Sequence, residues 1–411
     1  MIALPLSELR SLSLGVLEGD VAEITGVQVD SRRIEPGDLF VAVSGGEAYL
    51  DDARARGAGA TLAPDDAHAA LAALGGAVRA RTDARVVAIT GSVGKTSTKD
   101  ILAALLRPSL RTVAAERGFN NEVGLPLTLC RIEPDTEVVV TEMAMRAPGQ
   151  IRDLARIARP ELGVITSIAP VHLEQLGSLA NIARAKAELL DELPPGAVAV
   201  LPEDAPELEP FVPEGLDVRR FGPPEAEVRD GRTHVRWHGH DVVFGFAARH
   251  QATNAAAALT VADALGLEPP REPVDVAFSV WRSQEIELPG GGLLLNDAWN
   301  ANPVATKGAL AHLLERANGR RTVAILGEMA ELGPEAARYH EEIGRDAEAV
   351  DIVVGVGELA QHYAPDEWVP TAAEAVEVAR RVVEPGDAVL VKGSRSVGLE
   401  VVADALLEGQ A

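Results

Sequence analysis

Residues 85–97 read RVVAITGSVGKTS, and this stretch decides the fold. Its first half is apolar and β-branched, which is typical of a buried strand. Its second half holds two glycines, and the residues that follow place Ile101, Leu102, Leu105 and Leu106 on one face of a helix. A strand, a glycine turn and a helix together predict a phosphate-binding loop, because backbone amides and the positive helix N-terminus then face one anion.

This loop is expected to hold a nucleotide through Gly91, Ser92, Val93, Gly94, Lys95, Thr96 and Ser97. Lys95 is placed to reach the terminal phosphates, and the Thr96 hydroxyl to reach a magnesium ion. The spacing is shorter than the standard G-x-x-x-x-G-K-[ST] pattern, which needs glycine where this chain has Ile89. A glycine turn with an incidental lysine is the alternative, and the flanking strand and helix argue against it.

Further strands are predicted after the loop, at 137–141, 162–166 and 197–201, with helical segments between them. Strands that alternate with helices predict a parallel α/β sheet. Residues 202–236 are rich in Pro, Glu and Gly, which predicts irregular connections with one short antiparallel piece.

The two ends of the chain have patterns of their own. The N-terminal part has short strand-like runs at 27–29 and 39–43, an Ala-rich helix, and Gly75-Gly76 as the start of a linker. The C-terminal part has strand-like runs, each followed by a helix, at 293–296, 322–326, 352–356 and 388–391. The α/β pattern therefore predicts three domains: a small α/β domain at 1–82, a central P-loop ATPase-like parallel-sheet domain at 83–283, and a Rossmann-like domain at 284–411.

Composition limits the possible partners. Hydrophobic residues make up 47% of the chain, which is enough for sizeable cores, and the formal net charge is −24. An acidic surface repels phosphate backbones and anionic lipids, so no nucleic acid and no membrane insertion are expected. Cys130 is the single cysteine, and the first residues lack a signal peptide pattern, so we expect a cytoplasmic protein.

Three further residues point to metal chemistry near the loop. Glu142 follows the strand predicted at 137–141, and His172 follows the strand predicted at 162–166. Ligands bind at the carboxyl ends of strands in open parallel sheets, so both side chains are placed to hold magnesium. Lys186 lies on a predicted helix, where a solvated lysine is the ordinary interpretation, just as a structural role is the ordinary one for a lone histidine.

The shortened loop, together with PELGVITSIAPVHLE at 160–174 and AKAE at 185–188, resembles the Mur ligases and their folylpolyglutamate synthetase relatives. The resemblance implies ATP as cosubstrate and magnesium bound by Thr96, Glu142, His172 and a carbamoylated Lys186. Carbamoylation replaces a cation with an anion that can hold a metal. Ser167 stands where the family usually has asparagine.

Other stretches resemble the branch of this family that joins D-alanyl-D-alanine to UDP-N-acetylmuramoyl-tripeptide. They are DSR at 30–32, PGDLFVA at 36–42, FNNEVGLP at 119–126, NDAWNANP at 296–303, LGEMAELG at 326–333 and VKGSRS at 391–396. Trp299 replaces the tyrosine that is usual in this branch. The motifs span nearly the whole chain in the expected order, which is more specific than any single loop.

The resemblance assigns roles by position. For the UDP-linked precursor it implies Ser31, Arg32, Asn120, Asn121 and Asn300. For ATP, besides the loop, it implies Asn254, Arg282 and Asp297. For catalysis it implies Lys95, Lys186, His172 and Arg282. The ordinary alternatives are a turn cap for Ser31, a solvent-facing helix residue for Asn254 and an ion pair with Glu285 for Arg282.

The implied reaction is an ATP-dependent ligation through an acyl phosphate, by a monomer that acts on UDP-N-acetylmuramoyl-tripeptide and D-alanyl-D-alanine. One alternative is a ligase of the same superfamily with a different amino acid. The other is a P-loop ATPase switch without ligation, which would leave Glu142, His172 and Lys186 without a role.

Overall fold

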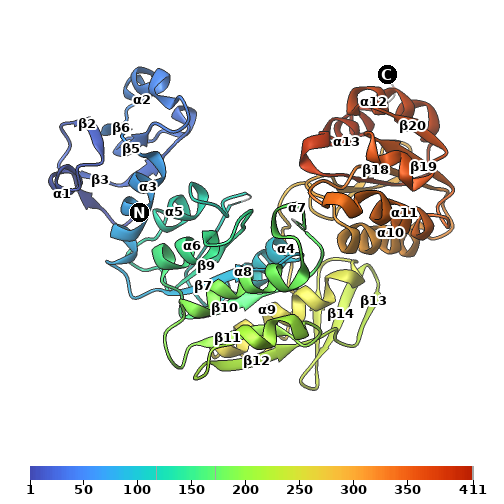
Figure 1. Ribbon diagram of the computed structural model, residues 1–411, viewed down its shortest axis with the longest axis horizontal. Helices are drawn as coiled ribbons and strands as arrows, with labels where there is room; N and C mark the ends of the chain where they lie inside the picture. Colours follow the sequence, from blue (N-terminus) through green and yellow to red (C-terminus); the bar gives the residue numbers. More distant parts are fainter. Residues whose placement is uncertain (117, 172, 410–411) are drawn as a thin grey trace.

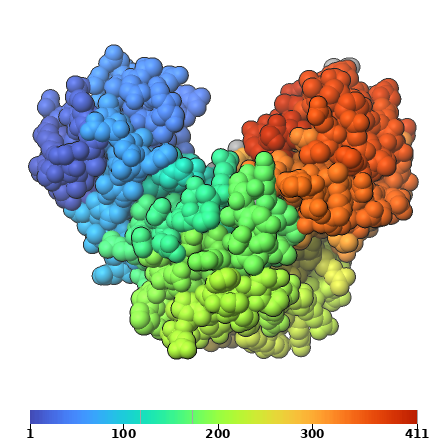
Figure 2. Space-filling view, viewed as in Figure 1, coloured from blue at the N-terminus to red at the C-terminus, as the bar shows by residue number. Residues whose placement is uncertain are grey.

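The computed structural model describes residues 1–116, 118–171 and 173–409, which form three lobes (Figure 1). The first and third lobes stand on either side of the central one, and a wide hollow separates them (Figure 2). The predicted α/β class with three domains is confirmed. In the part of the chain that the structure describes, no helix is long and apolar enough to cross a membrane.

The central lobe is built on a six-stranded parallel sheet with the order β12-β11-β10-β7-β9-β8. Its strands are β7 (Arg85–Thr90), β8 (Thr112–Ala114), β9 (Val138–Glu142), β10 (Leu162–Ile165), β11 (Val198–Pro202) and β12 (Asp217–Phe221). Val86 and Ala88 face one core and Val87 and Ile89 the other, so β7 is buried on both faces. This explains its continuous apolar run, since parallel sheets are covered by helices on both sides.

Two sets of helices cover this sheet. One face carries α4 (Lys95–Leu106) and α9 (Ala252–Ala264). The other carries α5 (Gly124–Leu129), α6 (Gln150–Ala158) and α8 (Leu179–Asp191), and the short α7 (Leu173–Leu176) precedes α8. The expectation for residues 202–236 was right about an antiparallel piece and missed a parallel strand. The segment adds β12 to the parallel sheet and also begins a separate antiparallel sheet of β13 (Ala226–Arg229), β14 (Arg232–Trp237) and β15 (His240–Phe244).

The first lobe has a four-stranded sheet, β2-β6-β5-β4, and a small β1-β3 pair. Its strands are β1 (Leu4–Pro5), β2 (Gly15–Gly19), β3 (Glu23–Ile24), β4 (Gly26–Gln28), β5 (Asp38–Val41) and β6 (Ala60–Pro64). Its helices are α1 (Leu6–Ser11), α2 (Leu50–Ala55) and α3 (Ala67–Arg79). Gly75 and Gly76 are not a linker, because both lie inside α3.

Helix α3 joins the first lobe to the central one. A Cβ on Gly75 would lie 2.9 Å from Pro126 Cα, so the glycine permits close contact with α5. Leu71 and Leu74 of α3 share one core with Leu125 of α5. The Arg79 side chain adds hydrogen bonds to the carbonyl oxygens of Ala158 and Arg159, at the end of α6.

The third lobe has a six-stranded sheet with the order β16-β17-β21-β18-β19-β20, in which only β16 runs antiparallel to its neighbour. Its strands are β16 (Gln284–Glu287), β17 (Leu293–Asp297), β18 (Thr322–Gly327), β19 (Ile352–Val356), β20 (Glu367–Val369) and β21 (Ala388–Lys392). Its helices are α10 (Pro303–Ala317), α11 (Ala336–Asp346), α12 (Ala372–Val382) and α13 (Glu400–Leu407). The short edge strands β16 and β20 were not predicted.

Candidate active site

The glycine loop forms the predicted strand-to-helix turn between β7 and α4. Gly91 has a φ of 143° and Gly94 a φ of 87°, both in the region that favours glycine. A Cβ on Gly91 would lie 2.0 Å from Thr166 Oγ1, and one on Gly94 would lie 2.2 Å from Asn254 Oδ1. Both positions therefore need glycine, and the backbone amides before α4 form a cradle that suits phosphate groups.

The residues after β10 fix the shape of the loop. Thr166 Oγ1 donates to Val93 O at 2.6 Å, and Val93 N donates to Ser167 Oγ at 2.8 Å. Ala169 N donates to Ser92 Oγ at 3.0 Å. Ser167, which replaces the usual asparagine, therefore supports the phosphate loop directly. His172, the predicted metal ligand after this strand, lies outside the described residues.

Lys95 opens α4, and its Nζ donates to Gly91 O at 2.7 Å, within the loop itself. Burial lowers the pKa of Lys95, the negative charge of Glu142 raises it, and the positive charge of Arg282 lowers it. Glu142 ends the strand that pairs with β7, and both Glu142 and Arg282 act on the charge of Lys95.

Glu142 ends β9 beside β7, with Ile89 as its cross-strand neighbour. It is 3% exposed, and Asn120 Nδ2 donates to its Oε1 at 2.8 Å. Asn120, assigned from the sequence to the precursor, therefore also orients the carboxylate. Thr96, 7% exposed, lies in the first turn of α4.

Lys186 is buried in the middle of α8 with 2% of its surface exposed. Burial, followed by the positive charge of Lys95, lowers the pKa of the Lys186 amine well below its usual value. No hydrogen bond or ion pair to Lys186 occurs among residues 1–116, 118–171 and 173–409. Burial near a second ammonium group therefore favours the neutral form of the Lys186 amine.

The donor set suits magnesium held together with a nucleotide. Within the described residues, no three His, Cys, Asp or Glu side chains are grouped closely enough to hold a metal on their own. Mg²⁺ is usually bound by one or two carboxylates together with substrate phosphates and water. Glu142 and the Thr96 hydroxyl, next to the phosphate cradle, match that pattern.

The junction between the second and third lobes holds the other residues predicted to contact ATP. Asn254, in the first turn of α9, faces Gly94, and its Nδ2 donates to Gln251 Oε1 at 2.6 Å. Arg282 lies 5.9 Å from the Trp299 ring centroid. Asp297 ends β17 and accepts a hydrogen bond from Lys392 Nζ at 2.5 Å.

The remaining predicted residues lie outside this junction, except for the backbone of Asn300. Ser31 and Arg32 lie in the first lobe, where Ser31 is buried and Arg32 is exposed and paired with Asp30 at 2.7 Å. Asn121 Oδ1 accepts from Gly124 N at 3.0 Å, at the start of α5. The backbone oxygen of the exposed Asn300 accepts from Lys392.

Sequence reasoning missed Lys392 and Gln251. Lys392, 2% exposed, pairs with Asp297 across the β17–β21 register, and a lysine directly after the apolar run 388–391 was the available signal. Gln251 is 3% exposed and has no such signal. Its partners are Ser283, between the second and third lobes, and Asn254 on α9.

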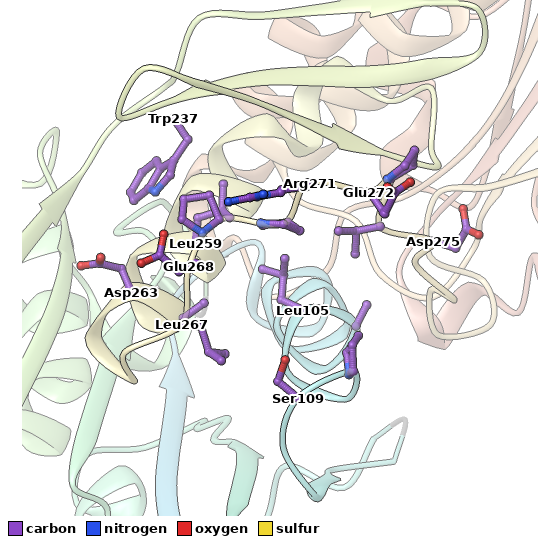
Figure 3. Close-up of a pocket in the computed structure, with 17 residues that line it drawn as sticks. Leu105, Ser109, Trp237, Leu259, Asp263, Leu267, Glu268, Arg271, Glu272 and Asp275 are labelled. Carbon is purple, nitrogen blue, oxygen red and sulfur yellow. The ribbon is translucent and has the colours of Figure 1, made fainter.

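A separate cavity of about 400 Å³ lies between α4 and α9, away from the end of α4 that carries the phosphate loop (Figure 3). Leu105 near the end of α4 and Leu259 on α9 line it, with Trp237 and Arg271 around them. Because α4 begins at Lys95 and Leu105 is near its last residue, this cavity is distinct from the phosphate loop.

Two stretches of the chain match known domain families. Residues 89–262 match the Mur ligase middle domain, and residues 281–395 match the Mur ligase glutamate ligase domain. The UDP-N-acetylmuramoyl-tripeptide–D-alanyl-D-alanine ligase of Escherichia coli K12 is 33% identical, with 99% of each chain covered. The ligase of the same name from Mycobacterium bovis is 34% identical, covering 93% of this chain and 92% of its own.

Solved structures agree with these matches. A MurF from Acinetobacter baumannii aligns over 99% of both chains, with a TM-score of 0.85 and 25% identity. The MurF ligase from Thermotoga maritima in complex with ADP covers 93% of this chain and 97% of its own, with a TM-score of 0.81 and 27% identity. The chain therefore belongs to the Mur ligase family, in its group of UDP-N-acetylmuramoyl-tripeptide–D-alanyl-D-alanine ligases.

Proposed function

We propose that this chain joins D-alanyl-D-alanine to UDP-N-acetylmuramoyl-tripeptide, with ATP converted to ADP and phosphate. The observation that carries the proposal is the grouping of the partly buried Lys95 with the buried Glu142 and Lys186 beside the phosphate loop. A nucleotide switch needs the loop and can use a carboxylate beside its magnesium ion, but it has no use for the buried Lys186. The relatives that match over nearly their whole length carry this ligase activity in their names.

The chemistry consists of two substitutions. The terminal carboxylate of the precursor attacks the γ-phosphate of ATP, giving an acyl phosphate and ADP. The amine of D-alanyl-D-alanine then attacks the acyl carbon, and phosphate leaves from a tetrahedral intermediate. Lys95 and Arg282 offset the negative charge that develops on the transferred group, which is the main protein contribution to phosphoryl transfer.

We also propose that Thr96, Glu142 and His172 hold magnesium, and that Lys186 carries a carbamate that completes the site. When bound, the metal neutralises phosphate charge. Support comes from the burial of Glu142 and Lys186 and from the lowered pKa of the Lys186 amine, because only the neutral amine reacts with carbon dioxide.

The remaining assignments follow the layout of the lobes. Residues 1–82 are proposed to bind the UDP part through Ser31 and Arg32, residues 83–283 to bind ATP, and residues 284–411 to bring the ligation partner. Asn120, Asn121 and Asn300 are proposed to contact the precursor, and Asn254 and Asp297 to contact ATP. The protein is proposed to act as a monomer in the cytoplasm.

The test is a phosphate-release assay with each substrate omitted in turn. Ligation predicts release only when ATP, UDP-N-acetylmuramoyl-tripeptide and D-alanyl-D-alanine are all present, with the UDP-pentapeptide as product in mass spectrometry. Release without the dipeptide would support a nucleotide switch. Equal turnover with a single amino acid would support a ligase of different specificity.

A further inference from the structure

The junction between the second and third lobes contains one continuous run of hydrogen bonds. It starts at Asn254, whose Nδ2 donates to Gln251 Oε1 at 2.6 Å. Gln251 Nε2 donates to Ser283 Oγ at 3.3 Å, and Ser283 N donates to Asp297 Oδ1 at 3.1 Å. The last hydrogen bond of the run is donated by Lys392 Nζ to Asp297 Oδ2. Gln251 is the member that connects the central lobe to the segment leading into the third lobe.

The first end of this run lies against the phosphate loop. Asn254 Oδ1 faces Gly94, where a Cβ would lie only 2.2 Å away, and Thr98 Oγ1 is 3.4 Å from the same oxygen. Because Gln251 Oε1 accepts from Nδ2, the Asn254 amide can turn only one way. Gln251 therefore sets which face of Asn254 points to the loop.

The other end of the run controls the backbone around Arg282. Trp281 has a φ of 64° and Ser283 a φ of 45°, so Arg282 lies between two non-glycine residues in the left-handed region. Such conformations persist only where the surroundings fix them. Here Gln284 Oε1 accepts from Trp281 N, while Asp297 and Gln251 hold the backbone and the hydroxyl of Ser283.

We infer that Gln251 is a positioning residue for ATP use, which sets the Asn254 amide beside the phosphate loop and, through Ser283, the placement of Arg282. The inference rests on the proposed function, since it concerns the residues proposed to contact ATP. Gln251 is 3% exposed, and its Nε2 also lies 3.1 Å from His250 Nε2. Loss of one buried hydrogen-bond partner leaves the other partner unsatisfied and free to reorient.

The test compares Gln251→Met, Ser283→Ala and the double variant in the full-length chain. Gln251→Met keeps the side-chain length but removes both amide bonds. We expect it to weaken ADP binding in calorimetry about tenfold and to lower kcat about tenfold. Ser283→Ala should lower kcat about fivefold, with KM for ATP within about twofold of the parent, because Asn254 stays oriented.

The double variant shows whether Gln251 and Ser283 lower kcat through the same contact or independently. If Gln251 acts on Arg282 through Ser283, the double variant should have the kcat of Gln251→Met alone. Thr260→Val is the matched control, because Thr260 is buried on α9, the helix that follows Gln251, and its hydroxyl donates to Ala256 O. It should keep the parent ADP affinity and kcat.

Several results would overturn the inference. They are parent-like ADP affinity and kcat in Gln251→Met, a parent-like kcat in Ser283→Ala, or single effects that multiply in the double variant. If Gln251→Met does not fold, Ser283→Ala still decides, because it removes only a hydroxyl group. ADP affinity does not depend on ligation, so a parent protein that binds ADP but forms no product would reject the proposed function and not this inference.

Discussion

Lys95 places a positive charge within the phosphate loop, where its Nζ contacts Gly91 O. Lys95→Ala should lower kcat about a thousandfold, because charge neutralisation dominates phosphoryl transfer. Thermal unfolding should change little, since the partly buried Lys95 makes no ion pair with another described residue. Steady-state ligation assays and calorimetric unfolding of the same preparation measure both. A variant with near-parent ligation would refute the assignment of the loop.

Lys186 gives a sharper test, because a carbamate and an ammonium group have opposite charges. Lys186→Ala and Lys186→Arg should each lower kcat about a hundredfold, the usual scale for loss of a group that supports a metal. Short carboxylates should restore part of the activity of the alanine variant by filling the site, and they should not restore the arginine variant.

Carbon-13 NMR of the parent protein in labelled bicarbonate gives an independent measurement of the carbamate. A carbamate resonance should appear in the parent and be absent from Lys186→Ala. Full activity in Lys186→Arg, or no such resonance in an active parent, would return Lys186 to an ordinary structural role.

At the scale of elements, the contact between α3 and α5 depends on one of two adjacent glycines. Gly75→Ala should lower the free energy of unfolding by about 1–3 kcal/mol, because its methyl group would press on the backbone of Pro126. Gly76→Ala is the matched control, since nothing lies within 4 Å of its Cβ position. It should raise the free energy of unfolding by about 0.5–1 kcal/mol through helix propensity. Urea unfolding of both variants decides, and equal changes would contradict the packing argument.

His250, in the short helix Arg249–Gln251 before α9, makes the stability of the protein depend on pH. Burial, and next the neighbouring His312, lowers the pKa of His250 to about 3. The unfolded chain takes up this proton near pH 6.5 and the folded chain does not, so stability falls as pH drops below about 6.5. The loss is at most about 1.4 kcal/mol per pH unit.

His250→Gln removes this titration. Its stability should therefore decrease less steeply than that of the parent between about pH 6.5 and 5, whatever the variant loses in packing. Chemical unfolding at a series of pH values measures the slope. Parallel slopes for the parent and the variant would show that His250 is protonated in the folded protein.

At the scale of the whole molecule, the lobes differ in how firmly they are joined. The first lobe shares a core with the central lobe, with Leu71 of α3 and Leu125 of α5 in the same cluster. The third lobe has cores of its own, built from residues after Gln284. A lobe with a separate core and a short linker is the part expected to move on ligand binding.

We therefore expect the third lobe to close toward the other two across the hollow seen in Figure 2. Solution scattering should give a smaller radius of gyration with an ATP analogue and UDP-N-acetylmuramoyl-tripeptide together than with either alone. Gly76→Ala provides a control that leaves the junction untouched. An unchanged radius at saturating ligand would argue against closure.

The sequence by itself determined the fold class and the phosphate loop, because both depend on local patterns. Residues 86–89 are continuously apolar, and Gly91, Gly94 and Lys95 follow directly, so the strand and the turn can be predicted from neighbouring residues. Only the tertiary structure decided that Gly75 lies within a helix, that β12 joins the central sheet, and that Gln251 and Lys392 are buried at the junction. Those features depend on which distant surfaces meet, through packing against Pro126 or hydrogen bonds across the junction, and such contacts leave no periodic signal in the chain.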